Sequence, residues 1–167
     1  DHSQSFNIST TAAFVLAGGG IPMAKHGNRS ISSKSGSADV LEALGLSLTV
    51  SPGKIDYLLK EAGIAFLFAP TLHPAMGAVM NIRKELATPT IFNLLGPIIN
   101  PYPLDHQLMG TYAGDSLVET AKTLGQLGRK RAIVVHGHGG MDEANLAGTT
   151  HCALYRDGAV EEFTFDP

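Results

Sequence analysis

The chain has 167 residues, of which 44% are hydrophobic and only 16% are charged, and its formal net charge is −3. This length and composition suit one folded domain of common size and exclude a disordered chain. The small acidic excess also argues against a dedicated nucleic-acid-binding protein, which usually carries a basic surplus.

The compartment is indicated by the cysteine count and by the absence of long apolar stretches. Cys152 is the one cysteine, so an internal disulfide framework is excluded and a reducing compartment, the cytoplasm, is expected. No stretch reaches the roughly 18 apolar residues of a membrane span, so we expect no membrane partner. The chain starts on Asp1 without a methionine, and we interpret it as a piece of a longer protein.

The first half of the chain alternates between helical and strand patterns. Capping residues before AAFVLA (12–17) predict a helix, IPMA (21–24) a strand and ADVLEALG (38–45) a second helix. Ser51-Pro52 opens a third helix, which Gly63 ends. IAFLFA (64–69) has the continuous apolar character of a strand buried on both faces, and helical spacing runs from 72 to 86.

The second half continues the same alternation. FNLLGPIINP (92–101) predicts a packed irregular connector because glycine and proline interrupt it. A strand is expected over 106–113, a helix over 115–128 and a buried strand over 131–137. The segment 151–163 predicts a hairpin around Asp157-Gly158.

This order of elements predicts an α/β fold, with a mostly parallel central sheet and helices on both sides, forming a single domain over residues 1–167. Ligands of such sheets bind beyond the carboxyl ends of the strands. The loops after residues 24, 69 and 137 are therefore the candidate sites, and unusual polar segments lie there.

The most polar of them is the serine-rich segment, residues 25–39, with the sequence KHGNRSISSKSGSAD. Lys25, Arg29 and Lys34 supply positive charge, the serines supply short donors, and Gly27 and Gly36 permit close backbone approach. The alternative is a solvated surface loop. Its density of donors between a strand and a helix favours phosphate binding.

Two further segments carry candidate ligands. SFNISTT (5–11) places hydroxyls and amides at a helix start, which suits an anion, although a simple helix cap is the better explanation of this segment taken alone. HGHGGMDEAN (136–145) follows a buried strand, and its Asp142-Glu143 pair suits Mg²⁺, with an ordinary acidic helix start as the alternative. His136 and His138 lack further ligands at transition-metal spacing and are expected in a loop.

Two single residues are also candidate substrate contacts. Arg83 on a predicted helix could hold a substrate carboxylate through a bidentate pair, and a surface salt bridge is the alternative. His73 follows a strand and could face a cleft.

These motifs, taken with HPAM and IRKELATPTIFNLLGPIINP, resemble the anthranilate phosphoribosyltransferase family in order and spacing. The resemblance implies transfer of phosphoribose from phosphoribosyl pyrophosphate (PRPP) to anthranilate with two Mg²⁺ ions, in a homodimer. It implies PRPP contacts at Asp1, Ser5, Asn7, Ile8, Ser9, Thr10, Lys25, His26, Gly27, Asn28, Arg29, Ser30, Ile31, Ser32, Ser33 and Ser37. It implies anthranilate contacts at Asn28, Arg83 and His73, and Mg²⁺ ligands at Ser9, Asp142 and Glu143.

The same resemblance implies that a helical N-terminal domain and a C-terminal remainder lie outside this chain, so that the chain alone is expected to be inactive. No covalent nucleophile or essential general base is expected, and Cys152 should be inert. The alternatives are a nucleoside phosphorylase of related fold, against which the acidic pair argues, and a non-catalytic nucleic-acid-binding relative, against which the net charge argues.

Overall fold

The structure is a computed structural model, which describes residues 6–30, 35–76, 85 and 91–167, with the backbone alone at 92–94. The chain divides into two compact units, one ending at Tyr102 and one beginning at Pro103. The expectation of one domain over residues 1–167 stays a prediction. None of the helices in the described part is long and apolar enough to cross a membrane.

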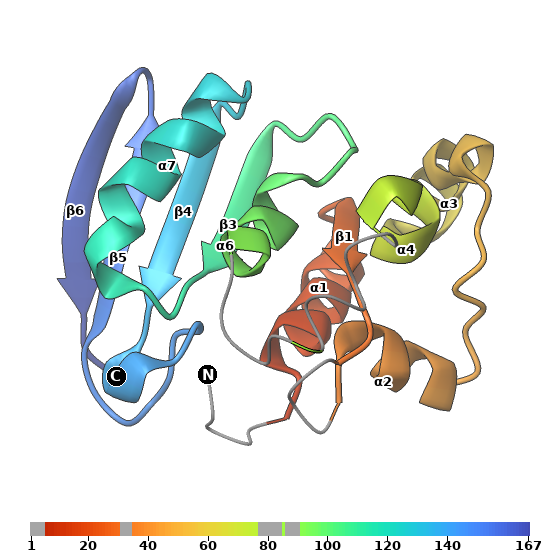
Figure 1. The fold of residues 1–167 in the computed structure, drawn as a ribbon, viewed down its shortest axis with the longest axis horizontal. Coiled ribbons are helices and arrows are strands. Elements are labelled where there is room, and N and C mark those ends of the chain that lie inside the picture. Colours follow the sequence, from red (N-terminus) through yellow and green to blue (C-terminus); the bar gives the residue numbers. More distant parts are fainter. Residues whose placement is uncertain (1–5, 31–34, 77–84, 86–90) are drawn as a thin grey trace. The chain divides into compact units, whose positions relative to one another are not determined.

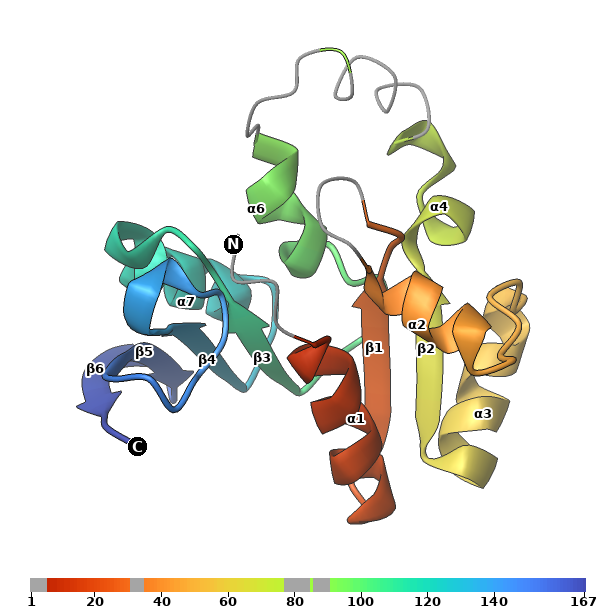
Figure 2. The same cartoon turned by 90° about the horizontal axis from the view of Figure 1, so that it is seen from below.

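The unit that ends at Tyr102 is built around two parallel strands, β1 (Met23–Gly27) and β2 (Ile64–Phe68), paired from Met23↔Ile64 to Gly27↔Phe68. Its helices are α1 (Ile8–Gly18), α2 (Ser37–Ala43), α3 (Ile55–Ala62), α4 (Ala69–Leu72) and α6 (Ile91–Ile98), with short 3₁₀ turns at Pro52–Lys54 and Pro74–Met76. Figure 2 shows α1 beside β1, and α4 and α6 at the end where both strands finish.

Strand β2 packs against other elements on both faces, as its continuous apolar run predicts, with Ala65 and Leu67 buried and Phe66 and Phe68 half-buried. Phe66 and Phe68 pack against a core that α2 supplies, whereas Ala65 and Leu67 belong to a separate cluster with Ile55 of α3. The two-residue alternation of the strand therefore sends successive side chains to two helices on opposite faces.

The unit that begins at Pro103 contains a four-stranded sheet in the order β3-β4-β5-β6 (Figure 1). These are β3 (His106–Gly110), β4 (Arg131–His136), β5 (Thr150–Arg156) and β6 (Ala159–Phe165), with 3₁₀ turns at Gly114–Ser116 and His138–Gly140. The β3–β4 pair is parallel, and the other two pairs are antiparallel. Helix α7 (Leu117–Gln126) buries Leu117, Ala121 and Leu124 and lies over β4 and β5 in Figure 1.

The α/β class with helices on both sides is confirmed, in sheets that are small and partly mixed. The hairpin is also confirmed: Asp157 and Gly158 take φ values of 53° and 83° between β5 and β6, as a tight two-residue turn requires.

Three local expectations are wrong. The irregular connector contains helix α6, because Pro97 is the next-to-last residue of the helix and removes a backbone donor only near its end. The first strand continues past IPMA to Gly27, because its pairing with β2 continues that far. His136 ends β4, which agrees with the strand expected over 131–137 and contradicts the separate expectation that it lies in a loop.

Candidate functional site

The start of α1 is organised by Asn7. Its side-chain Oδ1 accepts a hydrogen bond from the backbone N–H of Thr10 at 3.0 Å, which makes Asn7 the N-cap. Ser9 is exposed and Ile8 is half-buried, whereas Thr10 is buried, with an Oγ1 that contacts no partner in the described part of the chain. The capping interpretation of this segment is thus satisfied, and the Ser9 hydroxyl lies 3.5 Å from Asn7 Oδ1.

Lys25, the central residue of β1, contacts the start of α1. Its Nζ donates to Ser9 Oγ at 3.0 Å, although the two residues are sixteen positions apart in sequence. The parallel ladder with β2 sets the position of Lys25, and the Asn7 cap sets that of Ser9. An ammonium group and a hydroxyl at a helix N-terminus together form a suitable place for a phosphate oxygen.

His26, the next-to-last residue of β1, meets His73, which directly follows α4. Their ring centroids lie 5.2 Å apart in an edge-to-face arrangement. His26 Nδ1 lies 3.2 Å from the carbonyl of Gly96 in α6, and the Nε2 atom of each ring is buried without a partner among the described residues. Burial, the nearby His73 and Lys25 lower the pKa of His26, while the Gly96 contact opposes this shift.

The residues after β1 are held by α2. The carbonyl of Asn28 accepts from the N–H of Ala38 at 3.2 Å, and Asn28 Oδ1 accepts from the N–H of Arg29 at 2.8 Å. The Arg29 guanidinium makes a bidentate ion pair with Glu42. Gly27 packs closely on Ser37 and Phe66, because an added Cβ would lie 3.1 Å and 2.9 Å from their side chains.

The acidic pair lies in the other unit, on the loop between β4 and β5, where Asp142 and Glu143 are both half-buried. Two glycines fix the loop backbone. A Cβ on Gly110 would lie 1.5 Å from the carbonyl oxygen of Asp142, and one on Gly137 would lie 2.0 Å from that of Glu143. In the described part of the chain, no cluster of three or more His, Cys, Asp or Glu side chains suits a metal ion. The pair still fits Mg²⁺, which is often held by one or two carboxylates together with substrate phosphates.

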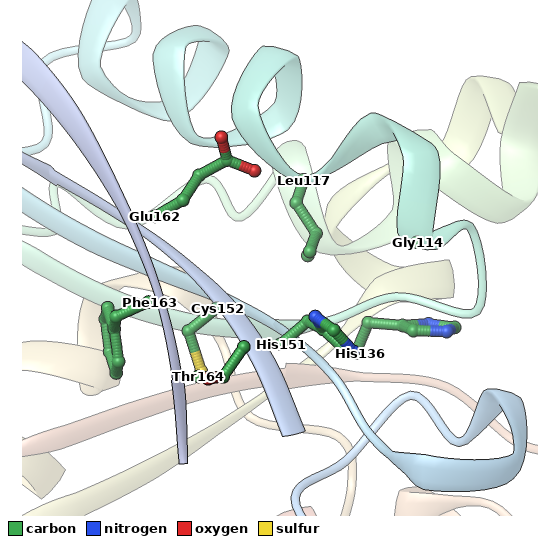
Figure 3. Close-up of a pocket in the computed structure, with 8 residues that line it drawn as sticks. All are labelled: Gly114, Leu117, His136, His151, Cys152, Glu162, Phe163 and Thr164. Carbon is green, nitrogen blue, oxygen red and sulfur yellow. The ribbon is translucent and has the colours of Figure 1, made fainter. Parts of the chain in front are cut away.

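A hollow of about 660 Å³ lies beside the first turn of α7 (Figure 3). His136 and His151 are direct partners across the β4–β5 ladder there, and His136 Nδ1 lies 3.0 Å from the carbonyl of Thr111. Glu162, Leu117 and Cys152 all line this hollow, as Figure 3 shows. Burial raises the pKa of the Cys152 thiol, which disfavours the reactive thiolate.

Six of the residues predicted to contact ligands lie outside the described residues. They are Asp1, Ser5, Ile31, Ser32, Ser33 and Arg83. Of the others, the structure brings Ser9 to Lys25 and His26 to His73.

A sequence profile described as a glycosyl transferase family, a/b domain, matches residues 1–167. The chain belongs to this family.

Relatives of known function lie within the same family. The chain is 63% identical over all its 167 residues to an anthranilate phosphoribosyltransferase from Listeria welshimeri, of which it covers 49%. It thus spans about half the length of the curated relatives it matches.

Solved structures agree with the sequence comparisons. The chain is similar to anthranilate phosphoribosyltransferase from Thermus thermophilus, with 43% identity and a TM-score of 0.82, over 96% of this chain and 47% of that one. It is also similar to the enzyme from Saccharomyces cerevisiae in complex with PRPP and Mg, with 32% identity and a TM-score of 0.85, over 98% and 45% of the two chains. The yeast enzyme in complex with 4-fluoroanthranilate matches with 31% identity and a TM-score of 0.83, over 98% and 44%.

Two residues of the site were not predicted. Asp39 and Glu42 both contact Arg29, and Asp39 also binds the backbone of the serine-rich segment. A sequence signal for Asp39 exists, because it is the third residue of a helix, where an acidic side chain often returns to the N-cap N–H. No comparable local signal exists for Glu42, since its partner is thirteen residues away.

Proposed function

We propose that this chain carries the substrate-binding chemistry of an anthranilate phosphoribosyltransferase. The enzyme would transfer the phosphoribosyl group of PRPP to anthranilate, giving N-(5-phosphoribosyl)anthranilate and pyrophosphate, in tryptophan biosynthesis. The contact between Lys25 Nζ and Ser9 Oγ is the observation that carries this proposal, because it joins two predicted phosphate-binding segments. The yeast relative in complex with PRPP and Mg supports it.

The phosphates of PRPP are assigned to the N-terminus of α1 and to the serine-rich segment. Lys25 supplies a charged donor, and Asn7, Ser9 and Thr10 supply a polar helix start at which anions are favoured. The other predicted PRPP contacts belong to the same proposal, including that of Arg29, whose guanidinium is engaged by Glu42. They are Asp1, Ser5, Ile8, His26, Gly27, Asn28, Arg29, Ser30, Ile31, Ser32, Ser33 and Ser37.

Of two magnesium ions, one is assigned to Ser9 and the second to Asp142 and Glu143, each together with substrate phosphates, and their charge would neutralise the leaving pyrophosphate. Ser9 Oγ accepts a hydrogen bond from Lys25, and a hydroxyl oxygen is also a hard donor atom of the kind that Mg²⁺ prefers. The carboxylates of Asp142 and Glu143 suit a hard cation. Their backbone is fixed by Gly110 and Gly137.

Anthranilate is assigned to Asn28, Arg83 and His73. Its aromatic amine is neutral at pH 7, so it needs no deprotonation before it attacks the anomeric carbon of PRPP. The bond from that carbon to pyrophosphate breaks through an oxocarbenium-like transition state, and the new nitrogen–carbon bond forms as the nitrogen loses a proton. The residues of this chain therefore act by positioning and electrostatics, without a covalent nucleophile.

The proposal extends to the full-length protein, which would be a homodimer located in the cytoplasm. Light scattering on the full-length gene product tests the dimer.

The deciding experiment follows the loss of anthranilate fluorescence with the full-length gene product. Loss that requires both PRPP and Mg²⁺ is expected. A folded protein that consumes no anthranilate with both present would refute the proposed function.

A further inference from the structure

Asp39 lies where residues 28–30 and 36–38 of the serine-rich segment approach each other, and these two stretches are called the neck. Its Oδ2 accepts a hydrogen bond from the backbone N–H of Ser30 at 3.0 Å and another from that of Gly36 at 2.7 Å. These two N–H groups are six positions apart in sequence, so one carboxylate oxygen ties both sides of the segment together. Carboxylates that accept backbone N–H groups make stronger bonds than neutral acceptors do.

The two sides of the neck are also in close contact. A Cβ added to Gly36 would lie 2.4 Å from the nitrogen of Ser30, 2.7 Å from the carbonyl carbon of Arg29 and 2.8 Å from the carbonyl oxygen of Asn28. Only glycine leaves room for this approach. The Ala38 N–H to Asn28 carbonyl bond closes the same neck from the helix side.

The Arg29 side chain contacts groups of α2 and the end of β2 next to the neck. Its guanidinium pairs with Glu42, lies 3.6 Å from Asp39 Oδ1 and sits 5.8 Å from the centroid of the Phe68 ring. Three groups thus hold the side chain against α2 and the end of β2. The backbone N–H of Arg29 is engaged as well, by Asn28.

A carboxylate beside an anion-binding segment raises a physical question, because its charge should repel a phosphate. Here that charge is directed at two N–H groups and a guanidinium. The same bonds lower the pKa of Asp39, with the Ser30 and Gly36 N–H groups as the largest causes. The main structural effect of the carboxylate is therefore to hold the Ser30 and Gly36 backbone groups together.

We propose that Asp39 is a positioning residue that holds the backbone of Asn28–Ser30 and Gly36–Ala38 in the geometry that binds the pyrophosphate group of the substrate. The Arg29 side chain helps to hold the same backbone through its ion pairs with Asp39 and Glu42. This inference rests on the proposed function, because it concerns the same phosphate-binding segment. It differs from a simple helix-capping role in that ligand affinity, as well as stability, depends on Asp39.

The test measures Mg²⁺-pyrophosphate and PRPP binding by calorimetry with the full-length gene product. The variants are Asp39→Ala, Asp39→Asn and a matched control, Asp115→Ala, which removes an exposed aspartate at a helix start in the other unit. We expect Asp39→Ala to weaken pyrophosphate binding roughly tenfold, about the effect of one lost charged hydrogen bond. Asp39→Asn keeps an acceptor oxygen and should bind between Asp39→Ala and wild type, and the control should match wild type.

Kinetics give the second readout. Asp39→Ala should raise the KM for PRPP and leave the KM for anthranilate unchanged. A lower melting temperature with unchanged pyrophosphate affinity would reduce Asp39 to a helix cap and overturn the proposal. Tighter binding by either variant would show that charge repulsion dominates, and would also overturn it.

The outcomes separate the two proposals. Wild-type protein that binds pyrophosphate in an Asp39-dependent way but consumes no anthranilate would refute the transferase and support the role of Asp39. Wild-type protein that binds neither pyrophosphate nor PRPP would refute both. If Asp39→Ala does not fold, the Asp39→Asn variant provides the test. A pyrophosphate affinity of Asp39→Asn equal to that of wild type would then overturn the positioning role of Asp39.

Discussion

Replacing Gly110 with alanine should disturb the acidic pair without touching a carboxylate. Gly110 lies in β3, and its added Cβ would fall 1.5 Å from the carbonyl oxygen of Asp142. Contacts of this kind are essentially never shorter than 3.0 Å, so the backbone at Asp142 must move by roughly 1.5 Å. A displacement of about 1 Å in a catalytic arrangement can lower the rate about a hundredfold.

The assay is the PRPP-dependent loss of anthranilate fluorescence, measured across a range of Mg²⁺ concentrations. Gly110→Ala should lower kcat/KM by about a hundredfold and raise the Mg²⁺ concentration needed for half-maximal rate. Overpacking should also cost about 1–3 kcal/mol of unfolding free energy, which thermal denaturation measures separately.

The matched control is Gly53→Ala. Gly53 is exposed in a 3₁₀ turn, and its added Cβ would meet nothing within 4 Å in the described part of the chain apart from its own neighbours along the backbone. This variant should keep the wild-type rate and Mg²⁺ requirement. A folded Gly110→Ala protein with wild-type rate and Mg²⁺ requirement would refute the inference that the Gly110 contact positions the acidic pair.

Three further predictions address the metal, the pH dependence and the packing of α7. Asp142→Asn should weaken Mg²⁺-dependent use of PRPP and leave the melting temperature near that of wild type; an unchanged Mg²⁺ dependence would contradict the metal assignment. The pKa of His26 is lowered on folding. As the pH falls below about 6.5, His26 of the unfolded chain therefore takes up a proton before His26 of the folded chain does. The free energy of unfolding should decrease from about pH 6.5 down to the lowered pKa. Urea unfolding at several pH values should show this loss, and His26→Asn should reduce it. Gly125→Ala would place a Cβ 2.2 Å from the ring of Tyr155 and should lower the unfolding free energy by about 1–3 kcal/mol, whereas an unchanged melting temperature would show that the ring moves aside freely.

The elements that local chemistry defines could be predicted from the sequence. The apolar run of β2, the Asn7 cap and the Asp157-Gly158 turn each depend on neighbouring residues, and each is found in the structure. The serine-rich segment and the acidic pair were likewise visible, because their residue types are unusual for their positions after strands.

Helix α6 shows where local signals mislead. Glycine and proline within residues 92–101 indicated an irregular connector, yet Pro97 stands where a helix loses little by including it. Hydrogen bonding to His26 of β1 then gives the Gly96 carbonyl a partner outside the helix. The choice between helix and connector therefore depended on packing that no short stretch of sequence reports.

The sequence by itself determined which residue types gather near the strand ends, since composition and spacing are local properties. Only the tertiary structure decided which of them meet. Lys25 contacts Ser9, His26 faces His73, and Asp39 ties Ser30 to Gly36. Those pairings follow from strand register and from the way α1, α2 and α6 pack, and such long-range geometry is set by the buried core and the backbone hydrogen bonds together.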